Sequence, residues 1–386
     1  MKPPALRPDV VPFNEFVLKV HGRCNLACDY CYLYRSGDDS WRERPRVMSD
    51  EVVARVAHRI ADHARTFDLG RVHVVLHGGE PLLAGPAAIG RIADAVSSAM
   101  PPSTALSLGV QTNGTLLDAR FLEVFSRWGI KVGVSLDGTD ADHDGHRRHH
   151  HGGGSMTRIA DGLALLTRPA TRHLFTGLLC TIDVTHDPVS TYRALIRHRP
   201  PVVDFLLPHG NWSRRPPHRG ADHRQTPYAD WLLRIFDHWF HAPERRTGIR
   251  LFENVMGLLL GDDIATESLG QAPCRTLVIE TDGSLEQVDS LKSAYPGAAR
   301  LGLNVHDHPL DAALSQPSIV ACQSGPAALA AECRACPIAR ICGGGLLAHR
   351  YRAGHGFDNP SVYGPDLWKI IHHIRARMLD ALGESL

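Results

Sequence analysis

The chain has 386 residues, of which 43% are hydrophobic, and a formal net charge of +1 at neutral pH. A charge so close to zero excludes the strongly basic surface of a typical nucleic-acid-binding protein. The length and the apolar content are sufficient for one large core or for two domains. No stretch approaches the roughly 18 uninterrupted apolar residues that a membrane-spanning helix needs, so we expect no membrane partner.

The N-terminal stretch MKPPALRPDVVPFNEF is rich in proline and lacks the apolar segment of a secretory signal. We therefore expect a cytoplasmic protein, whose thiols stay reduced. Nine cysteines in that setting indicate metal or redox chemistry more than disulfide bonds.

Short apolar runs alternate with longer amphipathic segments in the first part of the chain. Six runs predict β-strands, at residues 16–20, 72–76, 105–110, 130–136, 175–182 and 203–208. The helices predicted between them begin after Ser49, a plausible N-cap, and at residues 87–99, 118–128, 156–167 and 188–198. The alternation predicts an α/β fold with a parallel sheet or partial barrel over about residues 14 to 210.

The pattern changes after residue 210. YADWLLRIFDHWFHA and LFENVMGLLLG predict two further helices, and residues 364–382 predict a terminal helix. Asp282 and Gly283 stand between two β-like runs within residues 275–288, which indicates a hairpin.

Three cysteines, Cys24, Cys28 and Cys31, are crowded into CNLACDYC after the first predicted strand. Zinc usually takes four protein ligands, often as two paired halves, and no fourth ligand stands at an obvious spacing. A 4Fe–4S cluster held by three thiolates leaves one iron open. The amino and carboxylate groups of S-adenosylmethionine (SAM) suit such an iron, so this interpretation is favoured over zinc.

Polar residues follow the next three predicted strands: HGGEP at 77–81, QTNG at 111–114 and SLDG at 135–138. Each is also a good turn sequence. In a barrel, however, functional groups gather at the C-terminal ends of the strands, where all three stretches are expected.

The cysteine pattern, with Tyr30 before the third cysteine, resembles the hallmark of the radical SAM superfamily. The resemblance implies a partial (β/α)6 TIM-like barrel and a 4Fe–4S cluster on Cys24, Cys28 and Cys31. Glu80 would accept from the SAM amino group. The residues implied to bind SAM are Tyr30, Gly78, Gly79, Glu80, Pro81, Gln111, Thr112, Asn113, Ser135, Asp137 and Arg147.

A second group in CRACPIARIC, formed by Cys333, Cys336 and Cys342, resembles the SPASM extension of peptide-modifying radical SAM enzymes, which carries auxiliary 4Fe–4S clusters. The chain departs from that pattern, because Val288, Leu346 and Gly364 stand where cysteines are expected. The resemblance therefore implies one auxiliary cluster on three thiolates, with Cys274 as a possible auxiliary ligand. Other candidates for its fourth ligand are Cys322, His349 and Asp289, and a zinc knuckle is the alternative.

Longer segments, among them FVLKVHGRCNLACDYCYLY, VVLHGGEPLLAGP and ETDGSLEQVDSLKSAYPG, resemble the FxsB family of cyclophane-forming (triceptide) maturases. The implied substrate is a ribosomally made precursor peptide, and the implied product is a C–C link from an aromatic ring to a nearby Cβ. A reductant such as flavodoxin or ferredoxin would supply the electron. The expected organisation is an arm (1–13), the barrel (14–225), a helical linker (226–270), the SPASM-like domain (271–364) and a terminal helix (365–386).

Asp289 is the candidate base for the proton that the aromatic ring loses, although an Asp at a strand end often binds only backbone donors. The histidine-rich residues 143–154 are expected to form an exposed loop, with His143, Asp144 and Arg147 near SAM. Alternative functions are a maturase that makes another crosslink such as a thioether, a non-catalytic iron–sulfur electron carrier, and a zinc-stabilised binding protein.

Overall fold

The computed structural model describes residues 10–220, 222–264 and 266–383, so the first nine residues of the predicted arm lie outside the described residues. The chain divides into two compact units. The first contains the described residues up to Ser135, His143–Gly177 and Cys274–Gln323; the second contains Leu136–Asp142, Leu178–Pro273 and the described residues from Ser324 onward. The predicted SPASM-like segment 271–364 has residues in both units.

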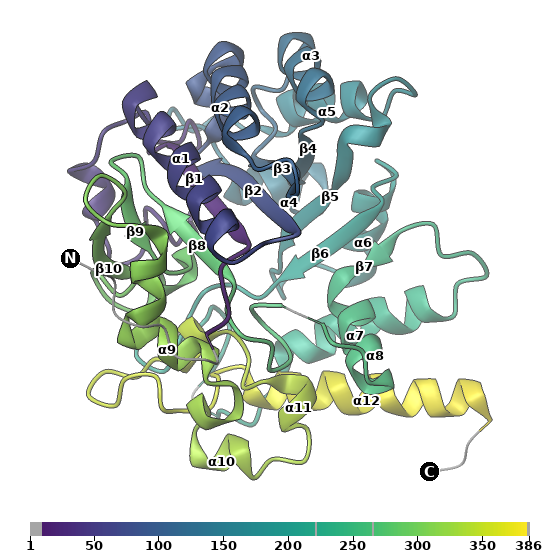
Figure 1. The fold of residues 1–386 in the computed structure, drawn as a ribbon. Helices are drawn as coiled ribbons and strands as arrows, with labels where there is room; N and C mark the ends of the chain where they lie inside the picture. Colours follow the sequence, from purple (N-terminus) through teal and green to yellow (C-terminus); the bar gives the residue numbers. More distant parts are fainter. Residues whose placement is uncertain (1–9, 221, 265, 384–386) are drawn as a thin grey trace. The chain divides into compact units, whose positions relative to one another are not determined.

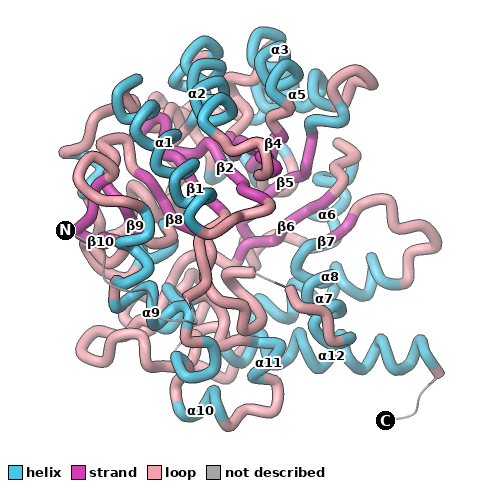
Figure 2. Tube along the Cα trace, viewed as in Figure 1, coloured by secondary structure: helices cyan, strands magenta, loops and turns pink. Residues whose placement is uncertain are grey.

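The first unit is built on a sheet with the strand order β10-β9-β8-β1-β2-β3-β4 (Figure 2, magenta). Strands β1 to β4 pair in parallel, and β8 joins the free edge of β1, also in parallel. The strands span Glu15–His21 (β1), Arg71–Gly78 (β2), Ala105–Thr112 (β3), Lys131–Ser135 (β4), Thr276–Ile279 (β8), Ser284–Glu286 (β9) and Arg300–Asn304 (β10). The antiparallel β8–β9 pair is the predicted hairpin, with Gly283 at φ 81° in its turn.

Helices α1, α2 and α3 lie side by side along this sheet (Figure 1). The Ser49 hydroxyl accepts from the Val52 amide at the start of α1, which confirms the predicted cap. Asp118 caps α3 in the same way, through the amides of Arg120 and Phe121. The helices of this unit are α1 (Asp50–Thr66), α2 (Pro86–Ala99), α3 (Ala119–Trp128), α5 (Met156–Leu166) and α9 (Pro317–Gln323).

The two faces of the sheet differ in polarity. Along β2, Val72, Val74 and Leu76 are fully buried, whereas the alternate residues His73, Val75 and His77 are only half-buried. Polar side chains of this second face pair across strands: Glu15 bonds His73 at 3.1 Å and accepts from the Thr276 hydroxyl at 2.9 Å. One face is therefore packed apolar core, and the other carries most of the polar side chains of the strands.

In the second unit, β5, β6 and β7 pair in parallel. The elements are β5 (Phe175–Thr181, in this unit from Leu178), β6 (Val202–Leu206), β7 (Gly248–Ile249), α6 (Pro188–Ile196), α7 (Pro227–Phe240), α8 (Arg250–Leu260), α10 (Ala331–Arg334), α11 (Ala339–Cys342) and α12 (Gly364–Leu382). Asp366, fully buried in α12, accepts from the amides of Tyr228 and Ala229 and pairs with Arg219. This carboxylate fastens the terminal helix to the start of α7.

The structure confirms the predicted α/β class with a parallel sheet, and the six predicted strands correspond to β1 through β6. Helix α4 (Asp140–His146) was not predicted, because its Asp, His and Gly residues carry no apolar period. Among the described residues, none of the helices has the length and apolar character required to cross a bilayer.

Candidate cofactor and catalytic site

The C-terminal ends of four parallel strands meet at one edge of the first unit. His21 at the end of β1 is in register with Gly78 of β2, and Thr112 of β3 is in register with Val134 of β4. The cysteine loop, HGGEP, QTNG and Ser135 thus follow neighbouring strands at the same edge, as the order of motifs predicts.

The loop after β1 holds Cys24, Cys28 and Cys31 partly exposed. The amide of Cys31 donates to the carbonyl of Cys28 at 3.3 Å, which forms a tight turn between these two thiols. The Cys24 sulfur lies 3.4 Å from the Leu26 amide and 3.7 Å from the Asn113 side-chain amide, and both donate to it. Donors of this kind stabilise a thiolate, which is the form that binds metal.

Burial raises the pKa of Cys24 to about 12, and the neighbouring Glu80 and Cys28 contribute to the same shift. Burial also raises the pKa of Cys31. In the metal-free chain these two thiols are therefore protonated at neutral pH, so metal binding must release their protons.

The donor set fits an iron–sulfur cluster better than zinc. The three loop sulfurs do not form a described group whose ligand atoms all lie within 4.8 Å of one another. Tetrahedral zinc, with bonds of about 2.3 Å, would hold its sulfurs roughly 3.8 Å apart. A cubane spreads its three thiolates over three irons, which suits this wider spacing.

Two glycines let the β2 turn approach the cysteine loop closely. A Cβ on Gly79 would lie 2.6 Å from the Arg23 carbonyl oxygen, and one on Gly78 would lie 2.2 Å from the His21 carbonyl oxygen. The Gly79 amide itself donates to His21 at 2.9 Å. Side chains are excluded here, so backbone is presented at the mouth of the site.

Glu80 is fully buried and joins two of the motifs. Its carboxylate accepts from the Leu82 amide at 2.9 Å, the Thr112 hydroxyl at 2.7 Å and the Asn113 amide at 2.7 Å. Burial raises its pKa to about 7, although these bonds oppose the shift. Its predicted contact with the SAM amino group stays a prediction, and the same holds for Pro81, which begins the short turn after it.

The polar residues after β3 and β4 bond one another. The Gln111 side chain donates to the Ser135 hydroxyl at 3.0 Å, and Asn113 donates to Asn25 at 2.9 Å. Asn25 in turn donates to Thr115 at 2.8 Å, which ties the cysteine loop to the QTNG turn. The sequence did not single out Asn25 or Thr115, because neither belongs to a recognisable spacing.

Two further residues predicted to bind SAM are Asp137 and Arg147, and the positive charge of Arg147 opposes the rise in the pKa of both Cys31 and Glu80. Asp137 belongs to the second unit and accepts from the Thr181 amide at 2.9 Å. Arg147 places its guanidinium carbon 5.5 Å from the Tyr30 ring centroid. His143 is fully buried and bonds the Ser155 hydroxyl at 3.0 Å, so it is an exception to the predicted exposure of the histidines.

A buried network of charged groups lies on the polar side of β1. Asp289 pairs with Lys19 and with Lys292, the latter at 3.1 Å. Lys292 also pairs with Glu280 and with Glu286, and Arg44 bridges these same two glutamates. Each of these six side chains is at most 9% exposed.

Burial alone would raise the pKa of Asp289, but the charges of Lys19 and Lys292 hold it well below its usual range. Lys19 also lies 3.2 Å from Nδ1 of His77, whose pKa falls to about 3 through burial and this neighbouring charge. Asp289 is thus ionised but weakly basic, and its predicted role as the proton acceptor stays a prediction.

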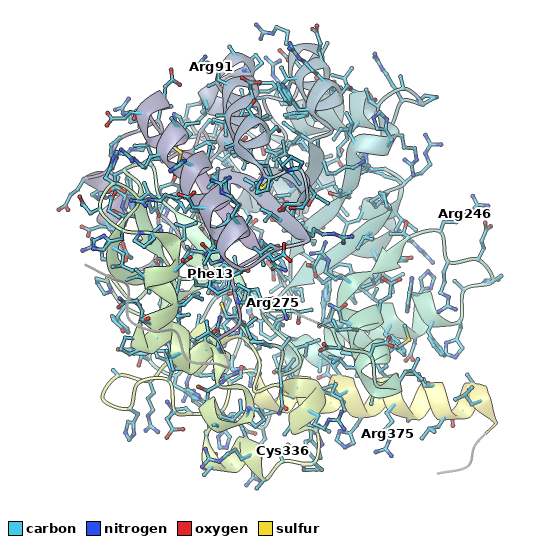
Figure 3. All side chains as sticks on the ribbon, in the orientation of Figure 1. Phe13, Arg91, Arg246, Arg275, Cys336 and Arg375 are labelled. Atoms are coloured by element: carbon cyan, nitrogen blue, oxygen red, sulfur yellow. The ribbon has the colours of Figure 1, made fainter. Side chains whose placement is uncertain are left out.

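The second cysteine group lies in the second unit, around α10 and α11 (Figure 3 labels Cys336). The Cys336 amide donates to Cys333 at 3.2 Å, again forming a tight turn between two thiols. Arg350 donates to the carbonyls of the glycine turn after Cys342, at Gly343, Gly344 and Gly345. Burial raises the pKa of Cys342 to about 11.

The candidate fourth ligands differ in position. Cys274, Cys322 and Asp289 belong to the first unit, so a role for any of them with this group stays a prediction. His349 belongs to the second unit and is 3% exposed, and its Nε2 has no hydrogen-bond partner among the described residues. Burial lowers the pKa of His349 well below its usual range, which leaves a neutral imidazole able to bind metal.

Comparison with known proteins gives a fold and, over part of the chain, a match to a family. Residues 18–191 match the model of the Radical SAM superfamily. The serine-type anaerobic sulfatase-maturating enzyme of Klebsiella aerogenes is 25% identical over 354 residues, which is 89% of this chain and 82% of that protein. The enzyme of the same name from Bacteroides thetaiotaomicron is 25% identical over 303 residues, or 75% of this chain and 72% of its own.

Solved structures share the fold at lower identity. Native anSMEcpe with bound AdoMet gives a TM-score of 0.81 at 21% identity, covering 96% of this chain and all (100%) of its own. SuiB of Streptococcus suis, bound to its precursor peptide SuiA, gives 0.57 at 15% identity, covering 88% and 73%. Residues 18–191 therefore resemble a radical SAM domain, and this match, together with the shared fold, implies S-adenosylmethionine and 4Fe–4S clusters as the cofactors.

Proposed function

We propose that this radical SAM enzyme modifies a ribosomally made precursor peptide by joining an aromatic ring to the Cβ of a nearby residue, in a three-residue cyclophane. The observation that supports it most is the meeting of the cysteine loop, HGGEP, QTNG and Ser135 at one edge of a parallel sheet. An electron carrier would need only the cysteines.

In this proposal, Cys24, Cys28 and Cys31 hold the cluster that binds SAM, and Cys333, Cys336 and Cys342 hold an auxiliary cluster. When bound, the first cluster and SAM supply the carbon radical that removes an unactivated Cβ hydrogen. Backbone at Gly78 and Gly79 approaches the cofactor because no side chain intervenes. The Gln111 and Ser135 side chains, which bond each other at 3.0 Å, would contact its polar groups.

The chain's own chemistry is removal of the ring proton after the crosslink forms. Asp289 is the proposed acceptor, and the ammonium groups of Lys19 and Lys292 keep it ionised. Once the ring that carries the new bond has given up one electron, for which the auxiliary cluster would be the acceptor, it is a strongly acidic cation. A carboxylate with so low a pKa is a weak base, so we expect Asp289 to take the proton by its proximity to this cation rather than by its basicity.

A second candidate function is sulfatase maturation. It is favoured by the relatives that carry that name and by the share of both chains that they cover. The crosslinking proposal rests instead on the longer FxsB-like segments.

The test is anaerobic co-expression with the small open reading frame beside its gene, followed by mass spectrometry of the peptide. The expected product lacks two hydrogens per crosslink and resists fragmentation between the joined residues. A parallel co-expression with a sulfatase tests the second candidate. An unmodified peptide beside a modified sulfatase would overturn the crosslinking proposal, and modification that survives Cys28→Ala would overturn both.

A further inference from the structure

The cysteine loop pairs with a second segment of the same unit, residues 146–150, here called the histidine segment. Leu26 and His149 form an antiparallel bridge. The Ala27 amide donates to the Arg148 carbonyl at 2.7 Å, and the Asp29 amide donates to the His146 carbonyl at 3.4 Å. The two segments therefore run together as a short ribbon over residues 26–29 of the loop, which include Cys28.

Side chains of the histidine segment reinforce this pairing. His150 Nε2 lies 3.0 Å from the carbonyl oxygen of Cys24. Because a carbonyl only accepts, Nε2 must carry the hydrogen of this bond. His146 Nδ1 lies 3.0 Å from the Asp29 carboxylate, which joins the loop again between Cys28 and Cys31.

The histidine segment is itself held in place by hydrogen bonds to the residues where α5 begins. The Asp144 carboxylate accepts from the amides of Ser155 and Met156 at 2.7 and 2.9 Å, where α5 begins. The Ser155 hydroxyl donates to the Arg147 carbonyl at 2.6 Å. The segment is thus anchored to the start of a helix and can hold the cysteine loop in place.

We propose that the histidine segment is a clamp that pre-shapes the cysteine loop for its cluster, with His146 and His150 as positioning residues. A flexible loop loses conformational entropy when it binds metal, and contacts that already exist in the metal-free chain reduce that cost. The inference rests on the proposed cluster ligands Cys24, Cys28 and Cys31.

The first test uses the metal-free chain, so that it is independent of activity. Hydrogen exchange at the Ala27 amide reports directly on the ribbon. His150→Leu removes one bond, and exchange should become roughly 3- to 10-fold faster, as expected for one hydrogen bond. His150→Gln keeps an N–H donor and should stay near the wild-type rate. His151→Leu is the comparison variant, because His151 is also exposed and its described contacts, a bond from the Gly153 amide and a stack on the His149 ring, do not reach the cysteine loop.

The second test uses the reconstituted full chain. Iron release to a chelator should be faster in His150→Leu and in His146→Leu than in wild type, and the SAM-responsive electron paramagnetic resonance signal should broaden. Equal exchange and equal iron release in wild type and His150→Leu would overturn the clamp, as would an equal effect of His151→Leu. Failure of the cluster assignment itself is distinguishable, since Cys28→Ala would then leave the SAM-responsive signal intact.

Discussion

The carboxylate of Glu80, which follows β2, accepts a hydrogen bond from the hydroxyl of Thr112 at the end of β3, at 2.7 Å. Its other oxygen accepts from the Asn113 amide at the same distance, 2.7 Å. The carboxylate thus fastens two neighbouring turns at the mouth of the site. Any contribution of Glu80 to SAM binding adds to this internal role.

Glu80→Gln should lower the free energy of unfolding of the metal-free chain by about 1–3 kcal/mol, because the glutamine NH2 would face the Asn113 N–H in a buried position. Urea unfolding measures this change. Thr112→Ser is the matched control: it keeps the hydroxyl that donates to Glu80 and accepts from the Gly114 amide, and it should cost less. If Glu80→Gln unfolds at the wild-type urea concentration but binds SAM more weakly, Glu80 serves in SAM binding and does not stabilise the fold.

Gly79→Ala should disrupt the cysteine loop, since the added Cβ would lie 2.6 Å from the Arg23 carbonyl oxygen. We expect a reconstituted variant that retains less iron and a lower melting temperature of the metal-free chain. Gly70→Ala, at the other end of β2, is the matched control, because its Cβ would meet no atom within 4 Å. If Gly79→Ala and Gly70→Ala retain the same iron and melt at the same temperature, the close approach of Gly79 to the Arg23 carbonyl is not needed for the structure of the turn.

The sequence predicted the strands and the motifs at their ends well, because buried strands carry apolar runs and the turns carry Gly, Asn and Asp. It did not predict β10 or the partners of Asp289. Lys19 lies in the apolar run of β1, and its partner Asp289 lies 270 positions further along the chain, so no local pattern predicts this pair. Lys292 follows Asp289 by only three positions, but nothing in the sequence shows that both side chains are buried. Pairings of this kind depend on which strand neighbours β1, and the order β9-β8-β1 is not written in any local pattern.

The same limit applies to the histidine segment. The composition of this segment predicted an exposed loop, and His150 is exposed. The hydrogen bond from the His150 side chain to the Cys24 carbonyl, however, joins residues far apart in the chain. Local sequence reports propensity and periodicity, whereas a side-chain-to-backbone contact of this kind follows from how α5 and the cysteine loop are placed in the fold.

Asp289→Asn should destabilise the metal-free chain at neutral pH by about 3–5 kcal/mol, because it leaves the buried Lys19 ammonium without its carboxylate partner, whereas Lys292 keeps Glu280 and Glu286. The pKa of Asp289 is lower in the folded chain than in the unfolded chain, where it is about 3.9. The ionised carboxylate therefore stabilises the fold above that unfolded pKa, and this stabilisation is lost as the pH falls from there toward the folded pKa. The difference in unfolding free energy between wild type and Asp289→Asn should therefore shrink from pH 7 toward pH 3. A difference that stays constant over this range would contradict the charge-pair origin.

Lys19→Met separates the role of Asp289 as a base from its role as an anchor. Without the Lys19 ammonium, Asp289 keeps Lys292 as a partner at 3.1 Å, and its pKa should rise. If Asp289 accepts the ring proton in its ionised form, the acid limb of the pH–rate profile for crosslinking should move to higher pH, by about 1 unit or more. Lys19→Arg keeps the charge and should leave the limb in place. An acid limb that is the same in Lys19→Met and wild type would remove Asp289 from the proton transfer, and the search for the acceptor would pass to Glu280, the other carboxylate that Lys292 holds.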